Sequence, residues 1–133
     1  MKKSIILLPL FFLMTLVFIF LVSWRHPRAS APQKVRLARI VVDSVYLDEY
    51  KALLKEGVEA AVSKEPGVLS LYAVFEKARP THLTILEMYA DEAAYQLHLK
   101  TAHFQKYKQA TLKMVKSLEL VETDPLIPEL KIK

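Results

Sequence analysis

Hydrophobic and polar residues are arranged along the chain in segments that predict an α+β domain. Residues 35–44 are rich in β-branched side chains, contain no Gly or Pro, and predict a strand. Residues 47–64 carry apolar side chains at three- and four-residue spacing with charged ones between them, which predicts an amphipathic helix. Pro66 and Gly67 follow closely and end that helix.

The next segments predict two strands and then a second helical region. Residues 68–76 and 81–89 have strand-like sequences, and Pro80 lies in the loop between them because it has no N–H to donate to a ladder. Asp91 is a good N-cap for the helix that follows. The remaining elements follow in order: a helix at 92–99, a further helical stretch from about 103 to 115, and a strand at 118–123.

The resulting order, β-α-β-β-α-β, is that of the ferredoxin-like fold. Its helices cover one face of the sheet, so the other face stays bare. The second predicted strand is nevertheless apolar on both faces, with Leu69, Leu71 and Phe75 on one and Tyr72 and Val74 on the other. Because an uncovered apolar face needs a partner, we expect a homodimer that packs sheet against sheet.

A long uncharged segment precedes the domain. Residues 5–24 contain no charged side chain and would span roughly 30 Å as a helix, about the thickness of a bilayer core. Two lysines before the segment and an Ala-Ser-Ala sequence at 29–31 resemble a cleavable export signal, whereas the length of the apolar run and Pro32 favour an uncleaved membrane anchor. We therefore expect a membrane-anchored or exported protein with an extracytoplasmic (periplasmic) domain, although the basic residues after the span oppose that orientation.

The predicted organisation is a signal anchor or signal peptide at 1–24, a linker at 25–34, the folded domain at 35–124 and a tail at 125–133.

Composition excludes several classes of function. The net charge is +5, but without the four basic residues in or beside the N-terminal segment, 15 basic residues face 14 acidic ones. A nearly neutral domain has no electrostatic footprint for nucleic acid. The absence of Cys excludes disulfides and thiolate chemistry.

Several short motifs follow one another at a characteristic spacing. In order along the chain they are Glu65-Pro66-Gly67, Pro80-Thr81, the run EMYADEAAY at 87–95, His98-Leu99 and His103-Phe104. Together they resemble the antibiotic biosynthesis monooxygenase (ABM) domain family, and especially its small quinol-monooxygenase-like members, over residues 35–123. The combination is specific, whereas any one motif alone would be weak.

The resemblance implies a dimeric α+β barrel with a pocket in each subunit between the sheet and the helices. It also implies a monooxygenase that oxidises phenols or hydroquinones without metal, flavin, haem or another cofactor. The haem-degrading branch uses an Asn on the first strand, a Trp and an axial His. Here that strand has no Asn, His98 stands near the Trp position and Lys108 near the axial position, so we do not expect haem degradation. Two alternatives stay open: an isomerase of a small carbonyl or sugar-phosphate signal compound, and a noncatalytic ligand-binding module.

An oxygenase of this kind needs a base for the phenolic proton, donors for an oxyanion and an apolar cavity. His98 is the first candidate for the base, because imidazole titrates near neutral pH and Tyr95 would share its helix face. The alternative is a structural histidine packed against the sheet. His103 either assists catalysis or bonds to backbone at the helix break. On one continuous helix the two histidines would lie about 140° apart, which argues against a shared metal ion.

The remaining candidates lie mainly on strands. Glu87 is either a catalytic carboxylate or half of an ion pair across the dimer, with Arg39 as its expected partner. Arg39 needs an anion, which Glu87, Asp43 or a ligand could supply. Tyr72 and Tyr89 could hydrogen-bond a quinol oxygen or belong to the core. The predicted site therefore contains His98, Glu87 and His103 as catalytic residues, and Tyr72, Tyr89, Tyr95 and Arg39 as substrate-binding residues.

Overall fold

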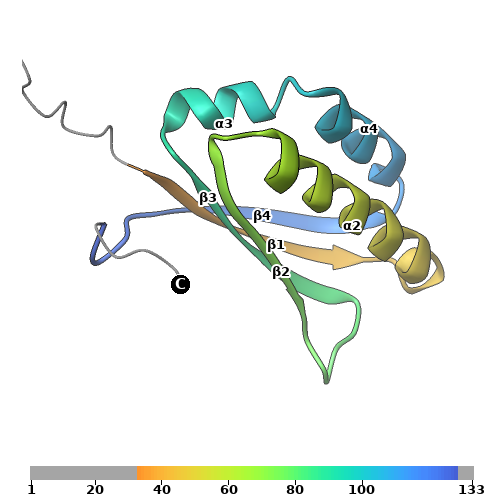
Figure 1. Ribbon diagram of the computed structural model, residues 1–133. Helices are drawn as coiled ribbons and strands as arrows, with labels where there is room; N and C mark the ends of the chain where they lie inside the picture. The colour runs from red at the N-terminus through yellow and green to blue at the C-terminus, as the bar shows by residue number, and fades with distance from the viewer. Residues whose placement is uncertain (1–32, 129–133) are drawn as a thin grey trace, which may run out of the picture. The chain divides into compact units, whose positions relative to one another are not determined.

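The computed structural model describes residues 33–128, in which an antiparallel sheet carries the α-helices on one face (Figure 1). The strands are β1 (Lys34–Val42), β2 (Val68–Phe75), β3 (His82–Tyr89) and β4 (Val115–Thr123), in the spatial order β2-β3-β1-β4. The helical elements are the short 3₁₀ turn η1 (Ser44–Tyr46) and the α-helices α2 (Leu47–Lys64), α3 (Glu92–His98) and α4 (Ala102–Thr111). This architecture confirms the predicted ferredoxin-like α+β fold.

The predicted targeting segment at 1–24 lies outside the described residues, so its role and the export of the domain stay predictions. Within residues 33–128, no helix is both long enough and apolar enough to cross a membrane.

Local sequence signals account for the helix boundaries. Helix α2 has the predicted bounds. Asp91 caps α3, because its Oδ1 accepts from the backbone N of Ala94 at 2.8 Å. Thr101 caps α4 by accepting from the backbone N of Phe104 at 3.4 Å. The predicted pause in the helix is therefore a complete break, and α4 ends at Thr111 rather than near residue 115, because the chain turns into β4 three residues earlier than expected.

The strand register decides which side chains face the helices. Arg36 of β1 is paired with Glu87 on β3 and with Glu122 on β4, so a cation lies between two carboxylates on the helix side of the sheet. The register of β2 against β3 shifts between Val68 and Ser70. This irregularity leaves Leu69 exposed and corrects the expectation that it shares a face with the other apolar residues of its strand.

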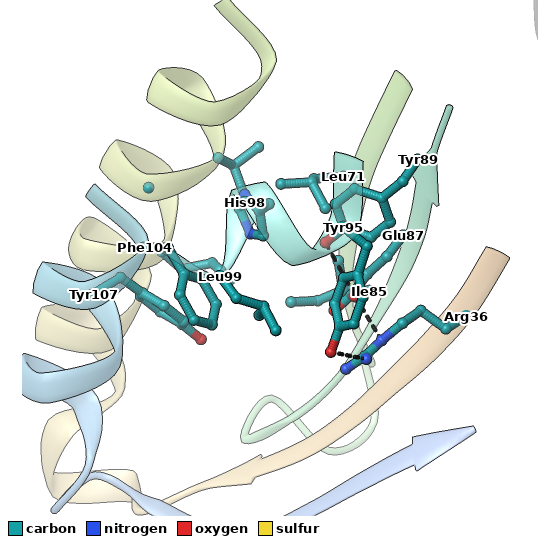
Figure 2. Close-up of a pocket in the computed structure, with 13 residues that line it drawn as sticks. Arg36, Leu71, Ile85, Glu87, Tyr89, Tyr95, His98, Leu99, Phe104 and Tyr107 are labelled. Carbon is teal, nitrogen blue, oxygen red and sulfur yellow. Dashed lines mark hydrogen bonds and ion pairs between the residues drawn. The ribbon is translucent and has the colours of Figure 1, made fainter. Parts of the chain in front are cut away.

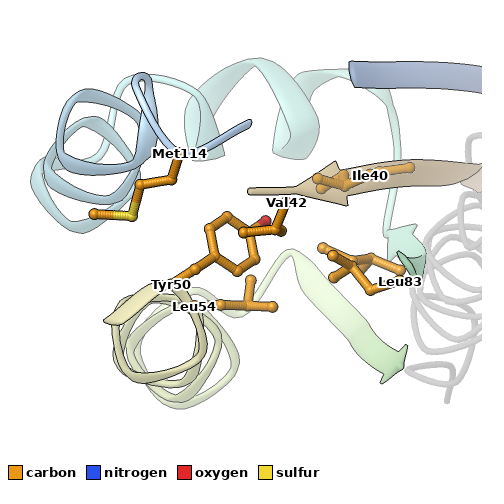
Figure 3. Close-up of a cluster of buried hydrophobic side chains, with 8 residues drawn as sticks. Ile40, Val42, Tyr50, Leu54, Leu83 and Met114 are labelled. Atoms are coloured by element: carbon orange, nitrogen blue, oxygen red, sulfur yellow. The ribbon is translucent and has the colours of Figure 1, made fainter. Parts of the chain in front are cut away.

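The main core lies between α2 and the sheet (Figure 3). Burying each large apolar side chain there contributes about 1.5–3 kcal/mol. Tyr50 of α2 is fully buried at its centre. The buried members of this core are Ala38, Ile40, Val42, Tyr50, Leu54, Leu83, Ile85 and Met114.

The opposite face of the sheet carries no helix in the described part of the chain (Figure 1). Tyr72 and Val74 on this face are 67% and 46% exposed, respectively. The bare apolar face is therefore present as expected, while the homodimer that would cover it stays a prediction.

Candidate functional site

A cavity lies between the sheet and helices α2, α3 and α4 (Figure 2). Its volume is about 80 Å³. This is the volume open to the centre of a water-sized sphere, and about 10–15 Å³ of it holds one water molecule. The cavity therefore has room for roughly six waters or for one small ring. The apolar side chains of its wall are Leu54, Val58, Leu71, Ile85, Leu99 and Phe104, and the polar ones are Arg36, Glu87, Tyr89, Tyr95, His98 and Tyr107. An apolar chamber with a few polar groups is the usual form of a small-molecule site.

One end of the cavity contains a buried cation. The Arg36 side chain is only 7% exposed, and its Nε lies 2.8 Å from Oε2 of Glu87. The Nε–H is not aligned with that oxygen, so the contact is an ion pair without a hydrogen bond. A second guanidinium nitrogen donates to the hydroxyl of Tyr95 at 2.5 Å, and the guanidinium carbon lies 4.8 Å from the Tyr95 ring centroid. Arg36 is thus fixed at the cavity by an anion and an aromatic ring.

Glu87 completes this polar end. It lies on the helix side of β3 because side chains alternate along the strand. Tyr89 donates from its hydroxyl to Oε2 of Glu87 at 3.3 Å. Burial raises the pKa of Glu87, while the charge of Arg36 acts in the opposite direction. The expected partner was Arg39 in a second subunit, and the structure corrects this: the partner is Arg36 of the same chain.

His98 is the last residue of α3 and is buried at the cavity wall. Its Nδ1 lies 2.9 Å from Oε1 of Glu65, the residue that follows α2. Its ring packs against Tyr89, at 5.5 Å between centroids, and against Phe104, at 4.8 Å. Within residues 33–128, Nε2 of the same ring makes no hydrogen bond and is not sealed from solvent. His98 therefore combines a fixed ring with one free nitrogen beside the cavity (Figure 2).

His103 contacts the same carboxylate oxygen. Its Nε2 lies 2.5 Å from Oε1 of Glu65, whereas a bond to backbone at the helix break was one of the two roles expected from the sequence. The break between α3 and α4 removes the premise of one continuous helix. The two histidines stand on different helices, and their rings lie 6.3 Å apart. Glu65 is a functional candidate that sequence reasoning missed. It was part of the Glu-Pro-Gly motif, but nothing in the local sequence indicates that two distant histidines reach it.

Glu65, His98 and His103 are also the residues that could hold a metal ion. One ligand atom of each lies within 4.8 Å of the others. Two imidazoles and a carboxylate are a donor set used for zinc and for non-haem iron. In the described structure these atoms are instead paired with one another. Among residues 33–128, the opposite ring nitrogens have no hydrogen-bond partners of the kind that usually orient metal-bound histidines, so the cluster fits a hydrogen-bonded group better than a metal centre.

Tyr107 borders the cavity on the side away from Arg36 (Figure 2) and forms a pair with Tyr50. The hydroxyls of Tyr50 and Tyr107 lie 2.6 Å apart, and Tyr107 lines the cavity. Burial raises the pKa of both phenols, so both stay protonated at neutral pH. The pair could not be predicted from the sequence, in which Tyr50 is one of several apolar positions along α2.

Two predicted substrate-binding residues lie elsewhere. Tyr72 projects from the face of the sheet without helices. Arg39 has a side chain that is 54% exposed and pairs with Glu119 at 3.2 Å, rather than with Glu87 or Asp43. Arg39 and Glu119 are register partners on β1 and β4, which explains the pairing. Of the predicted site residues, the structure brings Glu87, Tyr89, Tyr95 and His98 together at the cavity, and joins His103 to them through Glu65.

The model of the family described as antibiotic biosynthesis monooxygenase matches residues 35–110. Among solved structures, a protein of Bacteroides thetaiotaomicron provisionally named an antibiotic biosynthesis monooxygenase is 59% identical, with a TM-score of 0.75, and the match covers 77% of this chain and 97% of that one. A provisionally named monooxygenase of Lactobacillus acidophilus is 26% identical, with a TM-score of 0.68, over 71% of this chain and 45% of that one. A Nitrosomonas europaea protein, at 18% identity and a TM-score of 0.68 over 74% of this chain and 94% of that one, shares the fold. No curated protein matches the sequence.

Proposed function

Since the chain belongs to the antibiotic biosynthesis monooxygenase family, we propose that it is a monooxygenase that oxidises a small quinol-like aromatic with dioxygen. The observation that carries the proposal is the apolar cavity between the free nitrogen of His98 and the buried cation of Arg36. The family relationship supports the reaction class, and the cavity supports the substrate class.

The chemistry begins with removal of a phenolic proton. His98 is the base, since its Nε2 is free beside the cavity and imidazole titrates near neutral pH. The resulting phenolate is electron-rich enough to reduce dioxygen directly, so the proposed reaction requires no cofactor. Arg36, with Tyr95 beside it, stabilises the oxyanion inside a largely apolar chamber, where a fixed charge acts strongly.

The overall reaction balances without another reductant. For a hydroquinone, one oxygen atom of dioxygen replaces a ring hydrogen and the other leaves as water. The ring supplies all four electrons, and the product is a hydroxyquinone. The two hydrogens of the water come from the substrate, so the proton that His98 takes up returns to the leaving oxygen.

Oxygen uptake by the purified full-length chain with a series of single-ring hydroquinones tests the proposal. We expect uptake above the rate of autoxidation, and a loss of roughly 100-fold or more in kcat for His98→Gln. His82→Gln is the matched control, because His82 lies on β3 but does not line the cavity. Uptake no faster than autoxidation across the series, or full activity in His98→Gln, would overturn the proposal.

A further inference from the structure

Two histidines that are five positions apart in sequence converge on one carboxylate oxygen. Oε1 of Glu65 lies 2.9 Å from Nδ1 of His98 and 2.5 Å from Nε2 of His103. The Glu65 and His98 side chains are 10% and 7% exposed, and that of His103 is 19% exposed. The cluster therefore forms a nearly enclosed hydrogen-bonded group behind the cavity wall.

The chemistry of the acceptor determines where the ring hydrogens lie. An ionised carboxylate only accepts hydrogen bonds, so each ring nitrogen that contacts it must carry a hydrogen. In the neutral rings, the lone pairs then lie on Nε2 of His98 and on Nδ1 of His103.

We propose that Glu65 is a positioning residue that fixes His98 as the Nδ1–H tautomer and directs the Nε2 lone pair to the cavity. His103 is the second donor, which holds Glu65 in place from α4. The consequence for catalysis rests on the proposed function, because it treats His98 as the base. The tautomer itself does not depend on any activity.

The arrangement also prepares His98 for the charge it acquires. When Nε2 takes a proton, the ring becomes an imidazolium whose Nδ1–H already faces an anion at 2.9 Å. The contact that orients the neutral ring is therefore already in place for the charged ring. Tyr89 and Phe104 limit rotation of the ring from the two sides. His98 thus needs no reorientation between its neutral and charged states.

Long-range ¹⁵N–¹H correlation of the imidazoles in the labelled full-length chain tests the tautomer directly. We expect the Nδ1–H form for His98 in the wild type, and loss of that preference in Glu65→Ala. Glu56→Ala is the matched control, since Glu56 lies on α2, the helix that Glu65 follows, but is exposed and pairs with Lys106. A wild-type His98 in the Nε2–H form, or an unchanged tautomer in a folded Glu65→Ala variant, would refute the proposal.

A second pair of variants keeps the test independent of the folding of Glu65→Ala. His103→Ala removes the second donor, whereas His103→Gln retains an N–H that can reach Glu65. We expect kcat to fall in His103→Ala and to recover at least partly in His103→Gln, with KM little changed in both. Equal losses in the two variants would contradict the holding role of His103.

Kinetics of Glu65→Ala separate this inference from the proposed function. We expect kcat to fall by at least about tenfold, as for other residues that orient a catalytic histidine. If oxygen uptake is measurable and Glu65→Ala stays within about twofold of the wild type, the positioning role fails while the oxygenase stands. If no uptake is found but His98 is the Nδ1–H tautomer, the oxygenase fails while the assigned tautomer stands.

Discussion

Nδ1 of His98 and Oε1 of Glu65 are 2.9 Å apart, although 33 positions separate the two residues in sequence. The contact joins the end of α2 to the end of α3. It therefore holds α2 and α3 together beside the cavity. This contribution to the stability of the fold is separate from any role in catalysis.

This contact should contribute measurably to stability. We expect a coupling free energy of about 1–3 kcal/mol between Glu65→Ala and His98→Ala, because a buried hydrogen bond to a charged group is lost only once in the double variant. Urea unfolding of the wild type, both single variants and the double variant measures it. Strict additivity of the two losses would show that the contact contributes nothing to stability.

The ion pair between Arg36 and Glu87 gives a second prediction. Arg36→Met leaves a Glu87 side chain that is 12% exposed without its cation, and we expect a loss of about 3 kcal/mol. Replacing both residues together, by Met and Leu, should recover most of that loss, because no buried charge remains unpaired. The measurement is the urea unfolding free energy of each variant.

Arg39→Met is the control for this series. Arg39 lies on β1 like Arg36, but its pair with Glu119 of β4 is exposed, so the substitution should change stability by no more than about 0.5 kcal/mol. Equal effects of Arg36→Met and Arg39→Met would contradict the view that burial makes the Arg36 pair costly to break.

The position of these two arginines shows where prediction from sequence succeeds and where it stops. Arg36 and Arg39 both interrupt an apolar strand, and the sequence pattern does not indicate which one faces the helices. The register with β3 and β4 decides that, and it results from pairing between distant segments. Helix α2, in contrast, follows from local periodicity and its terminating residues, so its bounds could be predicted correctly.

The convergence of His98 and His103 depends on geometry of the same nonlocal kind. Sequence reasoning located a pause after α3 and identified His98 as a residue of the cavity wall. It did not give the angle between α3 and α4, which depends on how each helix packs on α2 and the sheet. Without that angle, the shared contact with Glu65 could not be predicted.

Stability should also depend on pH through Glu87. Burial raises the pKa of Glu87 above its ordinary value of 4.5. At a pH between the pKa of the unfolded chain and the higher pKa of the folded state, the folded state therefore holds a proton that the unfolded chain has lost. The folded state is therefore favoured below this window, and stability falls as pH rises through it. Arg36, Tyr89, His98 and Glu122 are the neighbouring groups that act on this carboxyl.

Comparison with Glu87→Gln isolates this effect, because the amide resembles the protonated carboxyl and does not titrate. Unfolding free energies measured from about pH 4 to 7 should decline less steeply in the variant than in the wild type. Parallel curves for the two proteins would exclude a raised pKa at this position.

The bare sheet face predicts a homodimer. Tyr72→Glu and Val74→Glu place charges on this exposed apolar face, and together they should shift the protein from dimer to monomer in light scattering coupled to gel filtration. Leu97→Glu is the control, because Leu97 is 65% exposed but lies on α3 in the helix layer. A monomeric wild type would contradict the expected assembly.

The two glycines give a final prediction with opposite signs. A Cβ added at Gly67 would lie 2.5 Å from Cβ of Ala94, which is closer than side-chain carbons approach. At Gly57, inside α2, the nearest atom would be Cβ of Tyr107 at 3.5 Å, an ordinary contact. The two positions differ in how much space a methyl group has.

Gly67→Ala should therefore push α3 away from the turn that contains Gly67 and lower the free energy of unfolding by about 1–3 kcal/mol. Gly57→Ala should instead raise it by roughly 0.5–1 kcal/mol through better helix propensity. Because α3 ends at His98, the Gly67 variant should also weaken the contact with Glu65 and perturb the imidazole resonances of His98, while Gly57→Ala leaves them unchanged. Urea unfolding and the same imidazole spectra measure both effects. If Gly67→Ala is destabilised but the His98 resonances are unaltered, the strain is relieved without moving the end of α3. The close approach of Gly67 and Ala94 would then not set the position of the histidine.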